Sequence, residues 1–417
     1  MIRVVIVDGF SSGKFLAREL YDYGCVLLHV SSDPDIHEYY YKNFDYTIYS
    51  AFLTCQDYAE TCQKISMFSP HYIIAGAESG VLLSDELNRH FALGFSNDYN
   101  HSHARRNKYD MIQAISSAGL AAAKQLKTQE WMAAEWWIKH HNLFPVVLKP
   151  LASAGSDGVF ICHNLTETKA AFAQILGSHS KLNIVNKQVL IQEYLDGVEY
   201  VVNMVSLQGK TRVTEVVRYT KVRLESGRIL YDIDDILDES FTHYWTLVDY
   251  TRQAIAALGI HNGPSHAEVM LTAQGPKLVE VAARTDGILR PEISARTTQL
   301  GQISATVMAI TEPERFLALT ESPAPYQLLN HSYNVCLINT HEGIFHQQDF
   351  VTELQKLASF SQAVFYIDDG QSIGVTQDVF SQPGTIYLVH SSKDVLRRDY
   401  RTIRQLEKQG IYLKNSG

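Results

Sequence analysis

The sequence predicts an α/β and α+β multidomain protein whose N-terminal domain is a doubly wound α/β domain. The chain has 417 residues, of which 46% are hydrophobic and 19% charged, a composition that suits about two to four domains with substantial cores. Near the N-terminus, short apolar runs alternate with a helical pattern, which is typical of a parallel sheet. After Val146 the pattern changes to strands and turns. These observations together predict more than one domain class in one chain.

Residues 1–96 are expected to form the doubly wound domain. The turn Asp8–Gly13 lacks the first glycine of the dinucleotide-binding pattern GxGxxG, so an ordinary strand-to-helix turn is favoured over a nicotinamide site. A nicotinamide oxidoreductase is disfavoured for this reason. The predicted strands are 2–7, 26–30 and 71–75, and the helix after the first of them carries Phe15, Leu16, Leu20 and Tyr21 on one face.

The rest of the chain is expected to contain several further helices and strands, with a proline-rich linker between its last two parts. Strands and turns are predicted from Val146 to about Ile233. The predicted helices are 108–118, 131–140, 244–258, 303–311 and 392–408. The predicted linker contains Pro313, Pro323 and Pro325, and the strands beyond it are 334–338, 364–367 and 385–389.

Charge and cysteine content exclude several classes of function. The formal net charge is −9 and there is no basic block, which disfavours nonspecific nucleic-acid binding. The five cysteines are odd in number and never spaced as CxxC, which argues against a disulfide framework or a zinc knuckle. No apolar run approaches the roughly 20 residues of a membrane span, and Met1–Val7 does not resemble a signal peptide. A cytoplasmic protein without a membrane partner is therefore expected.

The stretch Pro145–Gly158 is a candidate phosphate-binding segment. An apolar strand ends in Lys149, and a loop of small residues follows, Ser153-Ala154-Gly155-Ser156-Asp157-Gly158. Small residues allow backbone N–H groups to converge on an anion, and a lysine at the strand end adds a positive charge. The order differs from a Walker A loop, in which the lysine follows the glycines. An ordinary hairpin is the alternative interpretation.

A second candidate segment begins at Val189. An apolar strand leads to Glu193, and a turn at Gly197 leads to Glu199 and another apolar strand. Backbone groups of such a connection can contact an adenine, and a carboxylate beside it can accept hydrogen bonds from both ribose hydroxyls. Glu199 could equally be a solvated residue at a sheet edge.

Two carboxylates are predicted to face each other in the segment 267–281. If Ala273-Gln274-Gly275 is a three-residue hairpin loop, Glu268 lies opposite Glu280, with Cβ atoms about 5 Å apart. Two such carboxylates need a compensating cation, and their hard oxygen ligands favour Mg²⁺, with Mn²⁺ as the alternative. A solvent-facing pair bridged by Lys or Arg, or a register shifted by one residue, would remove this site. Just beyond it, Arg284 could stabilise charge on transferring oxygens, and Arg290 and Arg296 could bind a substrate carboxylate.

These segments, in this order, resemble the ATP-grasp superfamily over roughly residues 98–312. The resemblance implies an ATP-grasp fold with a mobile lid, which follows the N-terminal α/β domain and precedes a C-terminal α+β region. The implied domains are 1–96, an ATP-grasp core of 97–124 and 199–312, a lid of 125–198 and the C-terminal region 313–417. The resemblance places Lys108, Lys149, Ser153, Ala154, Gly155 and Ser156 at the ATP phosphates, Glu193, Tyr194 and Leu195 at the adenine, Glu199 at the ribose, and Glu268 and Glu280 at two Mg²⁺ ions.

Two further stretches are similar to carboxylate–amine ligases that make dipeptides, the L-amino-acid ligases. They are Gly76–Asp85, which contains Glu78, and Gly263–Glu268, which contains His266. The sequence departs from the family at Ala282, where an asparagine is usual, so one side-chain contact to the metal is missing. Thr285–Gly287 also replaces a glycine-richer stretch near the substrate, which puts the choice of substrate in doubt.

The resemblance implies an ATP-dependent carboxylate–amine ligase that joins amino acids through an acylphosphate and releases ADP and phosphate. Arg284, Lys149 and His266 are the predicted catalytic residues, and Glu78, His266, Arg284 and Arg290 the predicted substrate contacts. The alternatives are another ATP-grasp ligase or carboxylase, and a nucleotide-binding module without catalysis. The expected partners are small-molecule carboxylates and amines, and a homodimer is left open.

Overall fold

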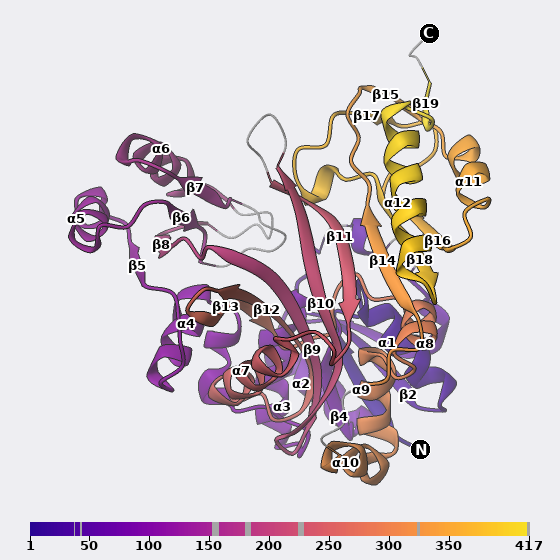
Figure 1. Ribbon diagram of the computed structural model, residues 1–417. Coiled ribbons are helices and arrows are strands. Elements are labelled where there is room, and N and C mark those ends of the chain that lie inside the picture. Colours follow the sequence, from indigo (N-terminus) through magenta and orange to yellow (C-terminus); the bar gives the residue numbers. More distant parts are fainter. Residues whose placement is uncertain are drawn as a thin grey trace.

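The computed structural model describes residues 1–36, 38–41, 44–151, 158–179, 185–223, 229–322 and 326–414. Within these residues the strands form four sheets, and the largest is a long curved sheet that runs through the middle of the molecule (Figure 1). A smaller sheet with two helices projects from one end of it, and helix α12 covers the other end. None of the described helices is long and apolar enough to cross a bilayer.

The N-terminal residues form the predicted doubly wound domain. Its four-stranded sheet is parallel throughout, in the order β3-β2-β1-β4. One expectation was wrong, because Tyr21 exposes 44% of its surface while Leu16, Ala17 and Leu20 form the buried face of α1. The elements are β1 (Arg3–Val7), α1 (Gly13–Asp22), β2 (Val26–Ser31), β3 (Tyr49–Thr54), α2 (Tyr58–Phe68), β4 (Tyr72–Ala75) and α3 (Val81–Phe91).

The projecting sheet is antiparallel, with the order β5-β8-β6-β7. Its core is separate from those of the rest of the molecule and is formed by residues such as Trp137, Val146 and Phe172. The elements are β5 (Gln125–Thr128), α5 (Trp131–His141), β6 (Val146–Lys149), β7 (Phe160–Cys162), α6 (Leu165–Ile175) and β8 (Val189–Glu193).

Helix α6 corrects the prediction that this stretch contains only strands and turns. The Asn164 side chain accepts a hydrogen bond from the Glu167 N–H, and the Glu167 carboxylate accepts one from the His163 N–H. This reciprocal capping satisfies N–H groups that a helix N-terminus leaves without partners. The four-residue pattern Asn-Leu-Thr-Glu was the sequence signal for it.

The large sheet is antiparallel and has the order β13-β12-β9-β10-β11-β14-β18-β16. Strands from the last hundred residues therefore extend the same sheet as the strands of the middle of the chain. Helices α4 and α7 pack on it near β12 and β13, where they share one hydrophobic core. The strands are β9 (Gly197–Leu207), β10 (Lys210–Arg223), β11 (Ile229–Leu237), β12 (Gly263–Thr272), β13 (Gly275–Ala282), β14 (His331–Cys336), β16 (Phe360–Phe365) and β18 (Gly384–His390).

The five helices predicted outside the N-terminal domain are present, and their ends differ from the prediction by one residue. Pro313 was expected in a linker but occupies the first turn of α10, where a missing N–H costs nothing. Pro323 and Pro325 lie outside the described residues. The remaining elements are α4 (Lys108–Ser117), α7 (Tyr244–Ala257), α8 (Pro291–Thr297), α9 (Gln302–Thr311), α10 (Pro313–Glu321), β15 (Gly343–Phe345), α11 (Gln348–Leu354), β17 (Ser372–Ile373), α12 (Lys393–Lys408) and β19 (Leu413–Lys414).

Candidate functional site

A cleft of about 930 Å³, counting its open mouth, lies between the projecting sheet and the β9–β12–β13 end of the large sheet. Its walls bring together eight of the residues that the sequence predicted for nucleotide and metal binding. Ser153, Ala154, Gly155 and Ser156 lie outside the described residues. The eight residues are Lys108, Lys149, Glu193, Tyr194, Leu195, Glu199, Glu268 and Glu280.

Glu268 and Glu280 are direct partners across the β12–β13 hairpin, as the sequence predicted. The predicted reason was wrong, because the turn has two residues, Ala273 and Gln274, rather than three. Pairing from this turn alone would place Val279 opposite Glu268 and turn Glu280 to the other face of the sheet. A β-bulge at Val279 adds the missing residue and restores the opposition of the two carboxylates.

Most charges in the cleft already have partners. Lys108 Nζ lies 2.9 Å from Glu280 Oε1, and Lys221 Nζ lies 2.6 Å from Glu199 Oε2. Lys277 forms a further ion pair with Glu193. An anionic ligand would compete with the carboxylates for these lysines, and a metal ion would compete with the lysines for the carboxylates.

Lys149 differs from the other lysines of the cleft. It is buried, and within the described part of the chain it forms no ion pair or hydrogen bond. Burial, followed by the positive charge of Lys108, lowers the pKa of Lys149 to about 8. A buried ammonium without a partner is unfavourable, so this position is suited to an anionic ligand.

The two opposed carboxylates are suitable ligands for a divalent ion. Glu268 and Glu280 expose 25% and 26% of their side chains, so both oxygen pairs can be reached from the cleft. In the described residues, no group of three or more His, Cys, Asp or Glu side chains is arranged to hold a metal ion. Mg²⁺ usually binds through one or two carboxylates plus phosphate oxygens and water. This pair fits that pattern.

A second cluster joins the N-terminal domain to the end of β13. The Glu78 carboxylate forms one ion pair with Arg106 and another with Arg284, whose Nε lies 3.0 Å from Glu78 Oε2. Burial opposes the charge of Glu78, but the two guanidinium groups outweigh it and lower the pKa of this carboxyl. The structure thus brings together Glu78 and Arg284, which the sequence analysis had proposed separately as substrate contacts.

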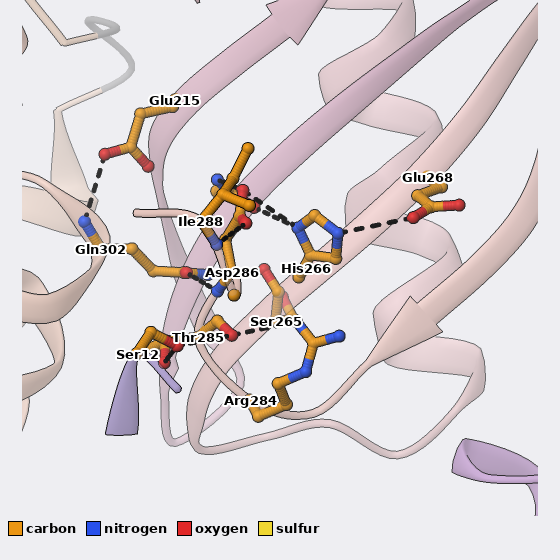
Figure 2. Close-up of polar contacts among 12 residues, drawn as sticks. Ser12, Glu215, Ser265, His266, Glu268, Arg284, Thr285, Asp286, Ile288 and Gln302 are labelled. Atoms are coloured by element: carbon orange, nitrogen blue, oxygen red, sulfur yellow. Dashed lines mark hydrogen bonds and ion pairs between the residues drawn. The ribbon is translucent and has the colours of Figure 1, made fainter. Parts of the chain in front are cut away.

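His266 is held between two carboxylates (Figure 2). Its Nδ1 lies 2.9 Å from Asn203 Oδ1 and 3.4 Å from Asp286 Oδ2, and its Nε2 lies 3.7 Å from Glu268 Oε1. The Asn203 amide nitrogen donates to Asp286, so its oxygen is free to accept the Nδ1–H. Burial lowers the pKa of His266, but Asp286 and Glu268 outweigh it and raise the value to about 9.

The loop after β13 fixes Asp286. Its N–H donates to Gln302 Oε1 at 2.8 Å, and its carboxylate accepts from the Ile288 N–H at 3.0 Å. The same loop is attached to the first turn of the chain, where the Ser12 and Thr285 hydroxyls lie 2.7 Å apart. The turn Asp8–Gly13 links strand β1 to helix α1, and it supports this loop.

The other two arginines lie in different surroundings. The Arg290 guanidinium lies 5.0 Å from the centre of the Phe15 ring and 5.8 Å from that of Tyr387. Arg296 donates to Ser361 Oγ at 2.7 Å, in the C-terminal part of the sheet. Neither forms an ion pair with a described carboxylate within 4.0 Å. A substrate contact by Arg290 therefore stays a prediction.

Sequence reasoning missed Asn203, Lys221, Lys277 and Asp286. Asn203 could have been found, because alternation along β9 places it on the same face as Glu199. Asp286 had no local signal, since its partners His266 and Asn203 come from other strands. The positions of Lys221 and Lys277 in the cleft depend on strand pairings that the sequence alone does not determine.

Three comparisons with known proteins agree with one another. A model of the ATP-grasp domain matches residues 142–292. Dapdiamide A synthase of Enterobacter agglomerans is 31% identical over 416 residues, 98% of this chain and 97% of that protein. The crystal structure of an L-amino acid ligase from Bacillus licheniformis superposes with a TM-score of 0.75 at 16% identity and covers 97% of both chains. The ADP complex of an N5-carboxyaminoimidazole ribonucleotide synthetase gives 0.70 at 14% identity, with 98% of both chains covered.

Proposed function

The chain belongs to the ATP-grasp family of ATP-dependent, ADP-forming carbon–nitrogen ligases, and we propose that it joins the carboxylate of one amino acid, or a related compound, to the amine of another. One observation carries the proposal: Glu268 and Glu280 face each other in the same cleft as Lys149, which forms no ion pair with a described residue. The similarity to a dapdiamide A synthase and an L-amino acid ligase supports the substrate class.

On the nucleotide side, the proposal assigns the adenine to the segment Glu193–Leu195 and the ribose to Glu199. Lys149 and Lys108 would bind the phosphates, together with the small-residue loop 153–156. Lys149 supports this assignment because its ammonium forms no ion pair with a described residue, so a phosphate would relieve the cost of its burial. Lys108 would exchange Glu280 for a phosphate when a metal ion takes that carboxylate.

Glu268 and Glu280 would hold Mg²⁺ ions, with Mn²⁺ as a substitute. A bound divalent ion supplies charge neutralisation for the phosphate oxygens. The position two residues after Glu280 is Ala282, which lies directly opposite His266 in the sheet. An asparagine side chain at position 282 would compete for space with the His266 imidazole, and the smaller alanine leaves room for that ring.

The proposed reaction has two displacements. A substrate carboxylate oxygen attacks the γ-phosphorus of ATP, and the bond to ADP breaks, which gives an acylphosphate. The nitrogen of the amine then attacks the acyl carbon, the carbon–oxygen bond to phosphate breaks, and the nitrogen loses a proton. Catalysis is mainly positioning and charge stabilisation. Arg284, held by Glu78, would bind the developing negative oxygens.

His266 would act at the same centre. Its Nε2 is directed toward Glu268 and its Nδ1 is engaged by Asn203, so only Nε2 can contact a substrate. The projecting sheet would act as a lid that excludes water from the acylphosphate. We assign residues 125–198 to this lid, 97–124 with 199–312 to the core, and 313–417 to a C-terminal region that extends the core sheet.

The test is a phosphate-release screen with ATP, Mg²⁺ and all pairs of the twenty amino acids, with product masses measured for each positive pair. Amino-acid-dependent phosphate release with a dipeptide mass is the expected result. Release that requires bicarbonate instead would favour the carboxylase alternative. ATP binding without any release would favour a module that has lost catalysis.

The metal assignment has its own variant and control. Glu280→Gln keeps the shape of the side chain but removes its charge, so phosphate release should fall by about 1,000-fold or more. Glu314→Gln is the matched control, because Glu314 is an exposed residue on α10, and its activity should equal that of the wild type. Retained turnover in Glu280→Gln would remove this residue from the metal site.

A further inference from the structure

A buried carboxyl group on β11 has no cation partner among the described residues. Asp234 exposes 3% of its surface, and it forms no ion pair within 4.0 Å among the residues that the structure describes. Its Oδ1 is buried and accepts no hydrogen bond, and the same is true of Oδ1 of the neighbouring Asn334. Buried oxygens without donors are costly and uncommon. Asp234 and Asn334 are direct partners across β11 and β14, so the two residues that carry these oxygens lie on one face of the sheet.

Asp234 and Asn334 lie on the face of the sheet that is covered by the loop after β13. Tyr219, Asp234, Asn334 and Tyr387 are direct partners across the four adjacent strands β10, β11, β14 and β18. Directly paired residues point to the same face. The Tyr387 hydroxyl donates to the Ile288 carbonyl at 3.0 Å, so this is the face that the loop after β13 covers. Asp234 therefore faces the loop that carries Asp286.

The charged groups that shift the pKa of Asp234 also belong to the candidate functional site. Burial is the main cause that raises the pKa of its carboxyl well above the ordinary value, and the negative charge of Asp286 adds to it. A hydrogen bond from the Asn334 side chain lowers the pKa, Glu199 raises it further, and His266 lowers it. Asp286, Glu199 and His266 belong to the nucleotide cleft and the His266 network, so Asp234 lies within electrostatic range of both.

We propose that Asp234, together with Asn334, binds the ammonium group of the amino acid whose carboxylate is activated. A carboxylate and an amide oxygen are both acceptors, and an ammonium group offers three donors. This inference rests on the proposed function, because it assigns one group of the proposed substrate to a position in the fold.

Glu78 is less suited to this role. Its two carboxylate oxygens are already occupied by Arg106 and Arg284, so its negative charge is neutralised within the protein. Asp234 has no such partner.

The site also distinguishes between the two amino groups of the reaction. A carboxylate stabilises an ammonium in its protonated form. The amine that attacks the acylphosphate must be unprotonated, whereas the amino group of the activated amino acid is kept unchanged in the product. The ammonium at Asp234 is therefore that of the carboxylate donor.

The test compares each amino acid with the 2-hydroxy acid of the same side chain. The probes are L-alanine, L-valine and L-phenylalanine, any donor that the phosphate-release screen adds, and the corresponding 2-hydroxy acids. Binding is measured by calorimetry with ADP and Mg²⁺ present, and ATP turnover is measured with a saturating amine. The wild type should prefer the amino acid. Asp234→Asn should reduce that preference by about tenfold or more, since it removes a charge-assisted hydrogen bond.

Asn is a discriminating substitution because it resembles a protonated aspartic acid. If Asp234 is only a buried acid that donates to Asn334, Asp234→Asn will bind and turn over both classes of compound like the wild type, and the proposal is overturned. Equal binding of amino acids and hydroxy acids by the wild type also overturns it.

Two further variants provide a matched control and a second test of the proposal. Asp235→Asn is the matched control, because Asp235 lies next in the chain on the opposite face, 2.8 Å from Arg218, and should leave the preference unchanged. If Asp234→Asn does not fold, Asn334→Ala removes the other acceptor and should reduce the preference in the same direction, by less. A wild type that turns over no amino acid contradicts the proposed function, while calorimetric binding would still report on Asp234.

Discussion

The proposed nucleotide side of the site (Lys108, Lys149, Glu199 and Glu280) and the proposed substrate side (Glu78, His266, Arg284 and Asp286) are built from similar charged residues but hold them differently. On the nucleotide side, the Glu280 and Glu199 ion pairs each join a buried member to one that is 26–30% exposed, and Lys149 has no partner among the described residues. The Lys277–Glu193 pair of the same cleft is less exposed than these two. On the substrate side, Glu78 is fixed by two arginines and His266 by Asp286, with side chains that are less than one-fifth exposed. One side is arranged to exchange partners, and the other is fixed before any ligand arrives.

This difference has an energetic consequence. A partly exposed ion pair contributes about 1 kcal/mol or less and can be given up when a ligand binds. Removal of one member of a buried pair costs about 3–5 kcal/mol, because the other charge is left uncompensated. Substitutions on the nucleotide side should therefore reduce activity without reducing the free energy of unfolding. Substitutions on the substrate side should reduce both quantities.

The largest effect is expected for Arg284→Met. The substitution removes one of the two guanidinium groups that neutralise Glu78 and also the group assigned to the developing oxyanion. Phosphate release should fall by about 1,000-fold, and the free energy of unfolding by about 3 kcal/mol in a urea titration. Arg315→Met is the control, since the Arg315 side chain on α10 is 64% exposed and pairs with Glu312 at the start of the same helix. If Arg284→Met were as stable as the wild type, the substrate side would not be preformed as described.

Lys149→Met should weaken ATP binding but increase the stability of the protein. ATP affinity should fall by about 10- to 100-fold, because a charged phosphate contact is lost. The free energy of unfolding should rise by about 1 kcal/mol, because the folded protein no longer buries an unpaired ammonium. Calorimetric binding of ATP and urea titrations measure the two quantities. A less stable Lys149→Met protein would show that Lys149 has a structural partner and would contradict the contrast between the two sides.

The sequence predicted the nucleotide side more completely than the substrate side. Lys149, Glu199, Glu268 and Glu280 each follow or lie within an apolar strand, and strand order is enough to bring them to one cleft. The opposition of Glu268 and Glu280 was predicted correctly from a wrong loop length, because a bulge compensated for the shorter turn. Bulges depend on local packing that composition and periodicity do not reveal.

The substrate side depends on contacts between distant segments. Asp286 meets Asn203, 83 positions earlier in the chain. Asp234 becomes notable only because its buried Oδ1 accepts no hydrogen bond from a described residue, which a sequence cannot show. The fold class and the helix ends were predictable because they follow from periodicity and from the residues at helix ends. A buried network follows from the tertiary arrangement and required the structure.

The pH dependence of ATP binding tests the same contrast with a smaller effect. The pKa of Lys149 is lowered to about 8 in the protein without ligand, and a bound phosphate would raise it again. ATP affinity should therefore decrease above pH 8, by at most about tenfold per pH unit. The sign for stability is the reverse: the unfolded chain binds more protons between pH 8 and the ordinary lysine pKa of 10.5, so the free energy of unfolding should rise across that range.

Lys149→Arg provides the control for this titration, because arginine stays charged throughout the range. Its ATP affinity should be flat between pH 8 and pH 10. If Lys149→Arg keeps the same slope as the wild type, the titrating group is another residue.

The smallest effect is expected for Lys221→Met. Lys221 is 30% exposed and pairs with Glu199, the residue assigned to the ribose. Burial already raises the pKa of Glu199, and the loss of Lys221 would raise it further, so the carboxyl can take up a proton instead of remaining as an uncompensated charge. The KM for ATP should increase only a few-fold, and the free energy of unfolding should change by less than about 1 kcal/mol. A loss of stability as large as that of Arg284→Met would mean that the nucleotide side is as rigidly paired as the substrate side.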